Sequence, residues 1–180
     1  MGIDDGMGTE RELMEARLDR CRAETVRKVS GLGWNLATRR LGSSATSAAG
    51  VLKHLTDVER WLFRHYLEGE AEVPRRTREE TPNGAFDLYD WDTLDDLIAD
   101  YELACEESRD RASRHDLSDR TALVVDWLEL QPSLRWVYLH MIEETARHNG
   151  HLDIYRELLD DRSMTTGLLT VADLESRHER

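Results

Sequence analysis

Three histidines and a glutamate share one side of a predicted helix near the end of the chain. His140, Glu144, His148 and His151 fall within an arc of roughly 80° when successive residues turn by about 100°. Apolar residues occupy the same arc, so these polar side chains are expected to point toward the protein interior. An unpaired charge is unfavourable there, and imidazole with carboxylate is a ligand set typical of divalent metal ions.

A metal site in a helix bundle takes its ligands from facing helices, so a second helix must contribute. The pattern of residues 44–67 predicts such a helix, in which His54 shares a face with Val51, Val58 and Trp61. His54 is therefore expected to point inward and to be the ligand from across the bundle.

Glu144 and His148 are separated by one helical turn, so both side chains can bind one ion. Together with His54 they make a His₂Glu set, which leaves a coordination position for water or substrate, as in catalytic zinc sites. We therefore predict that His54, Glu144 and His148 are the metal ligands, and that the ion activates a nucleophile.

Three further histidines are weighed against this set. His151 lies on the same arc, where it is a fourth ligand, a residue that orients a ligand, or a group that faces substrate and moves a proton. We expect His140 at the edge of the bundle and His65 at a solvated or interface position. A buried polar network or a subunit contact without metal is the alternative reading of the whole stripe.

The pattern of apolar residues predicts an all-α bundle of four long helices, at residues 9–30, 44–67, 92–113 and 132–160. Ser44, Thr46 and Ser47 are candidate caps of the second helix, and Pro132 fits the first position of the fourth. The connecting segments are expected to be irregular at residues 34–44, long at residues 70–89, and to contain a short helical turn at residues 121–127.

The composition excludes several classes of partner. Lys and Arg number 24 against 37 Asp and Glu, a net charge of −13 that repels nucleic acids and anionic membrane surfaces. The sequence has no apolar run of membrane-spanning length and no leader pattern, so a cytoplasmic protein is expected. Cys21 and Cys105 are far apart and are interpreted as small buried side chains. Trp61, Trp127, Trp136 and Tyr155 are interpreted as core aromatics.

Two segments of the chain resemble the DinB-like superfamily of metal-binding four-helix bundles. They are GVLKHLTDVERWLFRHYLEGE at residues 50–70 and LRWVYLHMIEETARHNGHLDIYRELLD at residues 134–160. Many members carry one histidine on the second helix and a His-x-x-x-His pair followed by Gly-Gln on the fourth. Here Glu144 stands for the first histidine of that pair and His151 for the glutamine.

The His, Glu, His triad is similar to that of mycothiol-dependent maleylpyruvate isomerase. The resemblance implies a zinc or nickel ion, a low-molecular-weight thiol cofactor such as mycothiol, a small-molecule substrate and a homodimer. That isomerase has a further C-terminal domain, which we do not expect here, so isomerase activity is not carried over.

Two functions remain open at this point, for a single domain over residues 1–180 with a helical core at about 9–160 and an extension at 161–180. The first is a metalloenzyme of the transferase or hydrolase class, in which the ion activates a thiol or water and His151 handles a proton. The second is a metal-stabilised bundle that serves as a dimerisation or binding module without turnover.

Overall fold

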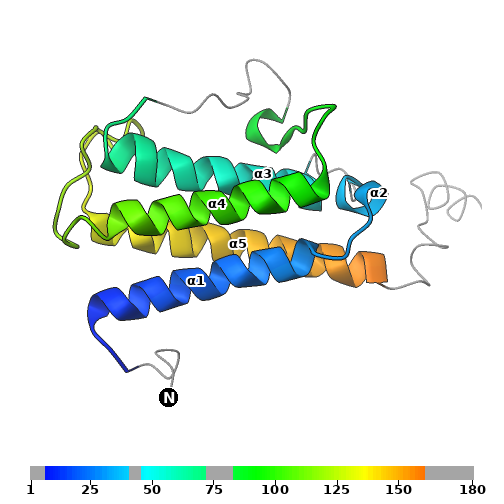
Figure 1. The fold of residues 1–180 in the computed structure, drawn as a ribbon, viewed down its shortest axis with the longest axis horizontal. Coiled ribbons are helices and arrows are strands. Elements are labelled where there is room, and N and C mark those ends of the chain that lie inside the picture. The colour runs from blue at the N-terminus through cyan, green and yellow to red at the C-terminus, as the bar shows by residue number, and fades with distance from the viewer. Residues whose placement is uncertain (1–6, 41–45, 72–82, 161–180) are drawn as a thin grey trace, which may run out of the picture.

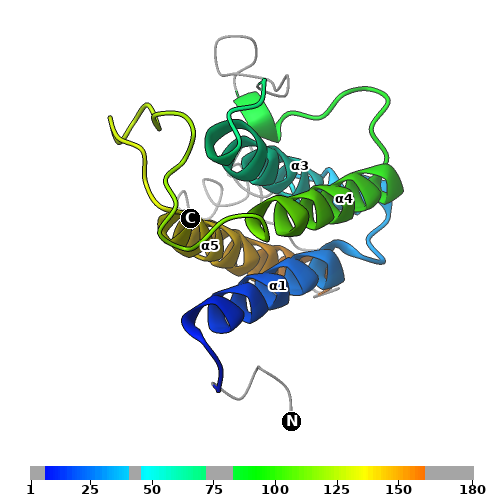
Figure 2. The ribbon, with the colours of Figure 1, turned by 60° about the vertical axis from the view of Figure 1, so that its left-hand side comes forward.

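Four long helical segments lie side by side in the computed structural model, which describes residues 7–40, 46–71 and 83–160 (Figure 1). They are α1 (Glu10–Val29), α3 (Ala48–Glu59) continued by the π-helix η2 (Arg60–Leu67), α4 (Leu94–Ala112) and α5 (Leu134–Asp160). α1 packs mainly against α5, and α3 mainly against α4, as the turned view in Figure 2 also shows. The predicted all-α bundle is confirmed.

Side-chain caps explain where three of the helices begin: Thr9 caps α1, Ser47 caps α3 and Thr93 caps α4. The Thr9 side chain accepts a hydrogen bond from the backbone N–H of Glu12, whose own side chain bonds back to the Thr9 backbone. Ser47 accepts from the N–H of Gly50 at 3.1 Å, so Ser47 is the cap among the three candidates. Each such cap pairs one of the N–H groups that a helix start leaves without an intrahelical partner.

Three expectations about the connections are wrong. Residues 34–37, expected to be irregular, form the short helix α2 (Trp34–Ala37). Residues 121–127 form no helical turn; they lead into a β-bridge between Val125 and Leu130. Pro132 precedes α5, and its carbonyl accepts a hydrogen bond from Thr121 at 2.9 Å. In each case the conformation is determined by hydrogen bonds within a local turn or to residues distant in sequence. The helical spacing of apolar residues does not predict such bonds.

Buried apolar residues form two clusters along the bundle. One joins the end of α1 to α3, the first half of α4 and the end of α5, and includes Leu52, Leu55, Tyr101 and Leu152. The other surrounds η2 and the first half of α5, and includes Phe63 and Met141. The candidate ligands lie in the middle of α3 and α5, close to where the two clusters meet.

Both cysteines are buried and unpaired with each other, as expected. Within the described parts of the chain, none of the helices has the length and apolar character needed to cross a bilayer. The extension at residues 161–180 lies outside the described residues.

Candidate metal centre

α3 and α5 run in opposite directions (Figure 1), and His54 on α3 contacts Glu144 on α5. His54 lies in the middle of α3, and Glu144 and His148 lie one turn apart on α5. The apolar face of each helix points into the bundle, and these polar side chains lie on that same face. The inward orientation expected for His54 and His148 is confirmed, since the His148 side chain is 7% exposed and that of His54 is 16% exposed.

The three side chains converge on one oxygen atom. Glu144 Oε1 lies 3.1 Å from His54 Nε2 and 3.2 Å from His148 Nε2. One ligand atom from each residue can be chosen so that all lie within 4.8 Å of one another. The two imidazole rings have centroids 4.9 Å apart and meet at 61°. The structure therefore brings together the three residues that the sequence predicted as ligands.

The carboxyl group of Glu144 is held in its charged form. The hydrogen bonds from His148 and His54 lower its pKa well below the ordinary value, although partial burial acts in the opposite direction. Its second oxygen, Oε2, forms an ion pair with Arg147 at 3.2 Å. Glu144 thus offers a negative charge to the centre, which is the form that a cation requires of a carboxylate ligand.

This donor set fits a divalent ion of the zinc type. Two imidazole nitrogens and a carboxylate oxygen meet at a point that is largely shielded from solvent, and zinc and nickel both accept such ligands. Three protein ligands leave a further coordination position. Their assignment as metal ligands remains a prediction that rests on this convergence.

A residue outside the predicted set covers His54. The ring of Phe86, in the 3-10 helix η3 (Gly84–Phe86), stacks on the His54 imidazole with centroids 4.2 Å apart and planes at 20°. Phe86 also lies 5.7 Å from the His148 ring. Gly50 permits this approach, because a Cβ there would lie 2.5 Å from the carbonyl oxygen of Phe86. Sequence reasoning missed both residues, and Gly50 inside a helical pattern was the available signal.

His151 lies beside the centre at the surface. Its side chain is exposed, and its Nδ1 is 3.4 Å from Nδ1 of His148, the ring nitrogen that faces away from Glu144. It does not belong to the group of three convergent ligand atoms. This position suits a residue that orients His148 through its second nitrogen, in the way that metal-bound histidines are commonly supported.

The two remaining histidines of this comparison lie away from the three convergent atoms. His140 is partly buried and stacks on Trp136, with ring centroids 4.7 Å apart. His65 is also partly buried, and its Nδ1 lies 2.8 Å from the carbonyl oxygen of Glu70. His65 therefore makes a local hydrogen bond near the end of η2.

The interpretation of the aromatic residues as core is wrong for one of them. Tyr155 is buried as expected, and Trp61 and Trp136 are partly buried. Trp127 is 47% exposed and lies on the loop before α5. It contacts the ring of Trp61, with centroids 4.8 Å apart.

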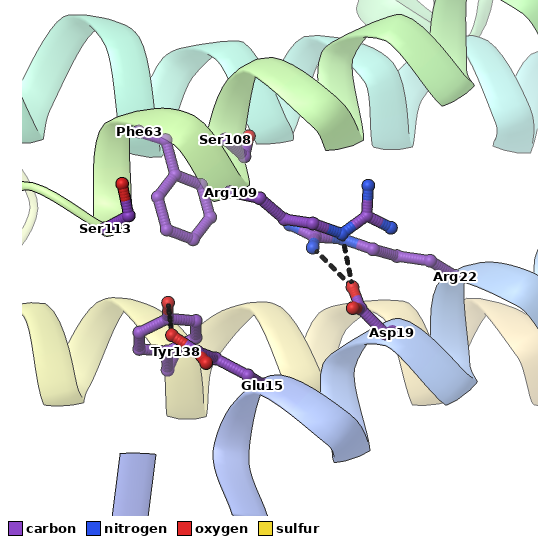
Figure 3. Close-up of a pocket in the computed structure, with 8 residues that line it drawn as sticks. All are labelled: Glu15, Asp19, Arg22, Phe63, Ser108, Arg109, Ser113 and Tyr138. Atoms are coloured by element: carbon purple, nitrogen blue, oxygen red, sulfur yellow. Dashed lines mark hydrogen bonds and ion pairs between the residues drawn. The ribbon is translucent and has the colours of Figure 1, made fainter. Parts of the chain in front are cut away.

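Two cavities lie elsewhere on the bundle. The first, of about 240 Å³, lies between α1, η2, α4 and α5, and Figure 3 shows that five of its polar side chains form hydrogen bonds among themselves. Asp19 there accepts hydrogen bonds from Arg22 and Arg109, both at 2.9 Å, and Glu15 accepts from Tyr138 at 3.0 Å. The second, of about 740 Å³, follows the groove between α1 and α4. Neither cavity is lined by the three convergent residues.

Comparison with known proteins assigns the chain to a family. A family model described as Mycothiol-S-transferase matches residues 13–161, a span that begins within α1, reaches the end of α5 and includes all three candidate ligands. A search of curated proteins found no match.

Proposed function

The chain belongs to the mycothiol S-transferase family, and on this premise we propose that it is a metal-dependent enzyme that transfers the thiol of mycothiol to a small electrophilic molecule. This assignment agrees with the resemblance to the DinB-like superfamily. The observation that supports the metal-dependent part is the convergence of His54, Glu144 and His148 within 4.8 Å.

In this proposal the three residues hold one divalent ion, with zinc as the first candidate. A bound ion of this kind would lower the pKa of a thiol at its open position, so that the thiol reacts as the thiolate near neutral pH. Glu144 contributes the negative charge that offsets part of the ion's charge. Arg147 holds the second oxygen of that carboxylate and so fixes which oxygen faces the two imidazoles.

The thiol must come from outside the chain. Burial raises the pKa of Cys105 to about 12, and burial also raises the pKa of Cys21. Neither cysteine therefore carries an appreciable thiolate fraction at neutral pH. A low-molecular-weight thiol that reaches the partly exposed centre is the reasonable nucleophile, which agrees with the family.

We assign His151 the task of handling a proton. Its exposed ring borders His148 and is open to solvent, so it is placed to accept a proton from an incoming thiol and to release it to water. A homodimer, which the superfamily resemblance implies, and a cytoplasmic location complete the proposal, and sedimentation of the purified chain tests the dimer.

Elemental analysis of purified protein is the first test. We expect about one zinc or nickel ion per chain in the wild type and His65→Gln, and at least about 100-fold weaker zinc binding in His148→Ala. Equal metal content in all three proteins would remove the proposed site.

The second test measures thiol transfer. Zinc-loaded enzyme should conjugate mycothiol to an electrophile, and a chelator should abolish the reaction, with recovery when zinc returns. Mycothiol alone should raise the melting temperature, by an amount that grows with the logarithm of its concentration once that concentration exceeds Kd. Zinc binding without turnover, and without stabilisation by mycothiol, would favour the non-catalytic binding module instead.

A further inference from the structure

An aromatic surface lies next to the candidate metal centre. It consists of Trp61 on η2, Trp127 on the loop before α5, and Trp136 and His140 on α5, and we call it the aromatic shelf. The ring centroids are 4.8 Å apart for Trp61 and Trp127, 6.2 Å for Trp127 and His140, and 4.7 Å for Trp136 and His140. Three separate elements therefore build one continuous set of rings.

α3 with η2 and α5 run in opposite directions (Figure 1), and both segments carry residues of the shelf and candidate ligands. Trp61 follows His54 along one helical segment, and His140 precedes Glu144 along the other. His140 and Glu144 are four residues apart, which is about 6 Å along a helix axis. The end of the shelf at His140 thus lies about one helical turn from the candidate ligand Glu144.

The π-helical segment orders the rings of η2. Backbone hydrogen bonds in a π-helix join residues five apart, and the rings of Trp61 and Tyr66, which are five apart, lie 5.1 Å from each other. Tyr66 also donates a hydrogen bond to Asp126 at 3.2 Å, which links η2 to the loop that carries Trp127. These contacts of Tyr66 hold Trp61 and the loop of Trp127 in place within the aromatic shelf.

The loop that carries Trp127 is fixed by backbone hydrogen bonds. Ala122 and Leu123 donate to the carbonyl oxygens of Leu67 and Tyr66, each at 3.1 Å, and Val125 donates to Leu130 at 2.9 Å. The bonds to Leu67 and Tyr66 pair carbonyl groups that the end of a helix leaves without an intrahelical partner. Trp127 is therefore presented by an anchored loop although its side chain is 47% exposed.

The surface around Trp127 is apolar as well as aromatic. Val124 and Leu130, on the same loop as Trp127, are 50% and 48% exposed, respectively. Contiguous exposed apolar groups on a soluble protein commonly mark a binding surface. Ring faces bind flat apolar molecules by stacking, whereas a sugar requires several polar partners for its hydroxyl groups.

We infer that the aromatic shelf binds the electrophilic co-substrate and selects planar aromatic electrophiles. This inference rests on the proposed function, since the thiol is assigned to the centre formed by His54, Glu144 and His148. With 1-chloro-2,4-dinitrobenzene as the probe, the mycothiol sulfur forms a bond to the ring carbon that carries chlorine. The carbon–chlorine bond then breaks, chloride leaves, and the thiol proton passes to solvent.

Kinetics of Trp127→Ala test this selection. In this variant KM for 1-chloro-2,4-dinitrobenzene should rise by about tenfold, because the loss of one stacking contact costs about 1.4 kcal/mol. KM for mycothiol should stay unchanged. Turnover of iodoacetamide, a small electrophile without a ring, should not change. Trp127→Phe should retain most of the aromatic preference, and Trp91→Ala, at a Trp that is 74% exposed on another loop, should behave as wild type.

Two results in these assays would overturn the inference. A raised KM for mycothiol with an unchanged KM for the electrophile would assign the shelf to the sugar of the thiol. Dissociation of a dimer by Trp127→Ala, seen by sedimentation, would assign it to contact between two copies of the chain.

A binding measurement separates this inference from the proposed function. 1,3-Dinitrobenzene has the same ring as the electrophile but no leaving group, and nitroaromatic rings quench tryptophan fluorescence on contact. Quenching should saturate in the wild type and Trp91→Ala, and saturate at about tenfold higher concentration in Trp127→Ala. Saturable binding without any thiol transfer would contradict the proposed function alone, whereas unsaturable quenching in the wild type would contradict the shelf alone.

Discussion

Gly50 and Phe86 are packed so closely that any side chain at position 50 would force the backbone of one segment to shift. A Cβ on Gly50 would lie 2.5 Å from the carbonyl oxygen of Phe86 and 3.2 Å from Oγ of Ser47. The same approach sets the Phe86 ring on the His54 imidazole at 4.2 Å. The conformation of a segment distant in sequence thus determines how one candidate ligand is covered.

Gly50→Ala should therefore destabilise the protein and weaken metal binding. Backbone overpacking costs about 1–3 kcal/mol, and displacement of the ring that shields His54 should lower zinc affinity by about tenfold. Urea unfolding and zinc titration measure the two effects. Gly150→Ala is the matched control, because Gly150 lies in α5 with nothing within 4 Å of its Cβ position. It should raise the free energy of unfolding by about 0.5–1 kcal/mol, and equal effects at both glycines would contradict the packing explanation.

The ion pair of Arg22 and Glu59 is a second structural determinant. Two guanidinium nitrogens of Arg22 lie 2.7 Å from the two oxygens of Glu59, and the residues are 4% and 0% exposed. Arg22→Met should lower the free energy of unfolding by about 3–5 kcal/mol, because it leaves the Glu59 charge buried without its partner. Replacing both, as Arg22→Met with Glu59→Leu, should recover most of that loss.

Arg109→Met is the control for this prediction. Arg109 pairs with Asp19 at 2.9 Å, but both side chains are more than 40% exposed, so the loss should stay below about 1 kcal/mol. Urea unfolding followed by circular dichroism measures all four proteins. A double variant as unstable as Arg22→Met would show that the pair stabilises through packing and not through charge compensation.

The helices and the directions of their side chains were predictable from the sequence. Apolar spacing and the caps Thr9 and Thr93 define α1 and α4 locally, and the same periodicity directs His54 and His148 inward. These features depend on residues one to four positions apart, which a sequence displays directly.

Features that depend on distant contacts were not predictable in this way. The loop at residues 121–127 takes its shape from bonds to the carbonyls of Tyr66 and Leu67, and the exposure of Trp127 follows from that shape. The cover of His54 by Phe86 likewise depends on a fit to Gly50 across the bundle. The π-helix η2 has no local signal that we could identify in the sequence.

The two cysteines should be inert in the folded protein. Because burial raises the pKa of Cys105 to about 12, its thiolate fraction at pH 8 is roughly a thousandfold below that of an exposed cysteine. A Cys21→Ala variant isolates Cys105, and its reaction with a chromogenic disulfide reagent should be slower by about that factor than after unfolding in guanidinium. Stoichiometric labelling of the folded variant within seconds would contradict the assignment of the nucleophile to an external thiol.

His140 should make the stability of the protein depend on pH. Burial lowers the pKa of its imidazole from the ordinary value of 6.5, although Glu144 and Glu143 act to raise it and Arg147 acts to lower it. The unfolded chain therefore binds the proton more tightly than the folded one, so the free energy of unfolding falls as the pH drops below about 6.5 toward the lowered value. The slope stays well under the limit of about 1.4 kcal/mol per pH unit, because the ring is partly exposed. His140→Phe keeps a ring on Trp136 without the titration, so in chelator it should lose less stability than wild type between pH 7.5 and 5.5. Parallel pH profiles of the two proteins would show that the folded and unfolded chains bind this proton equally.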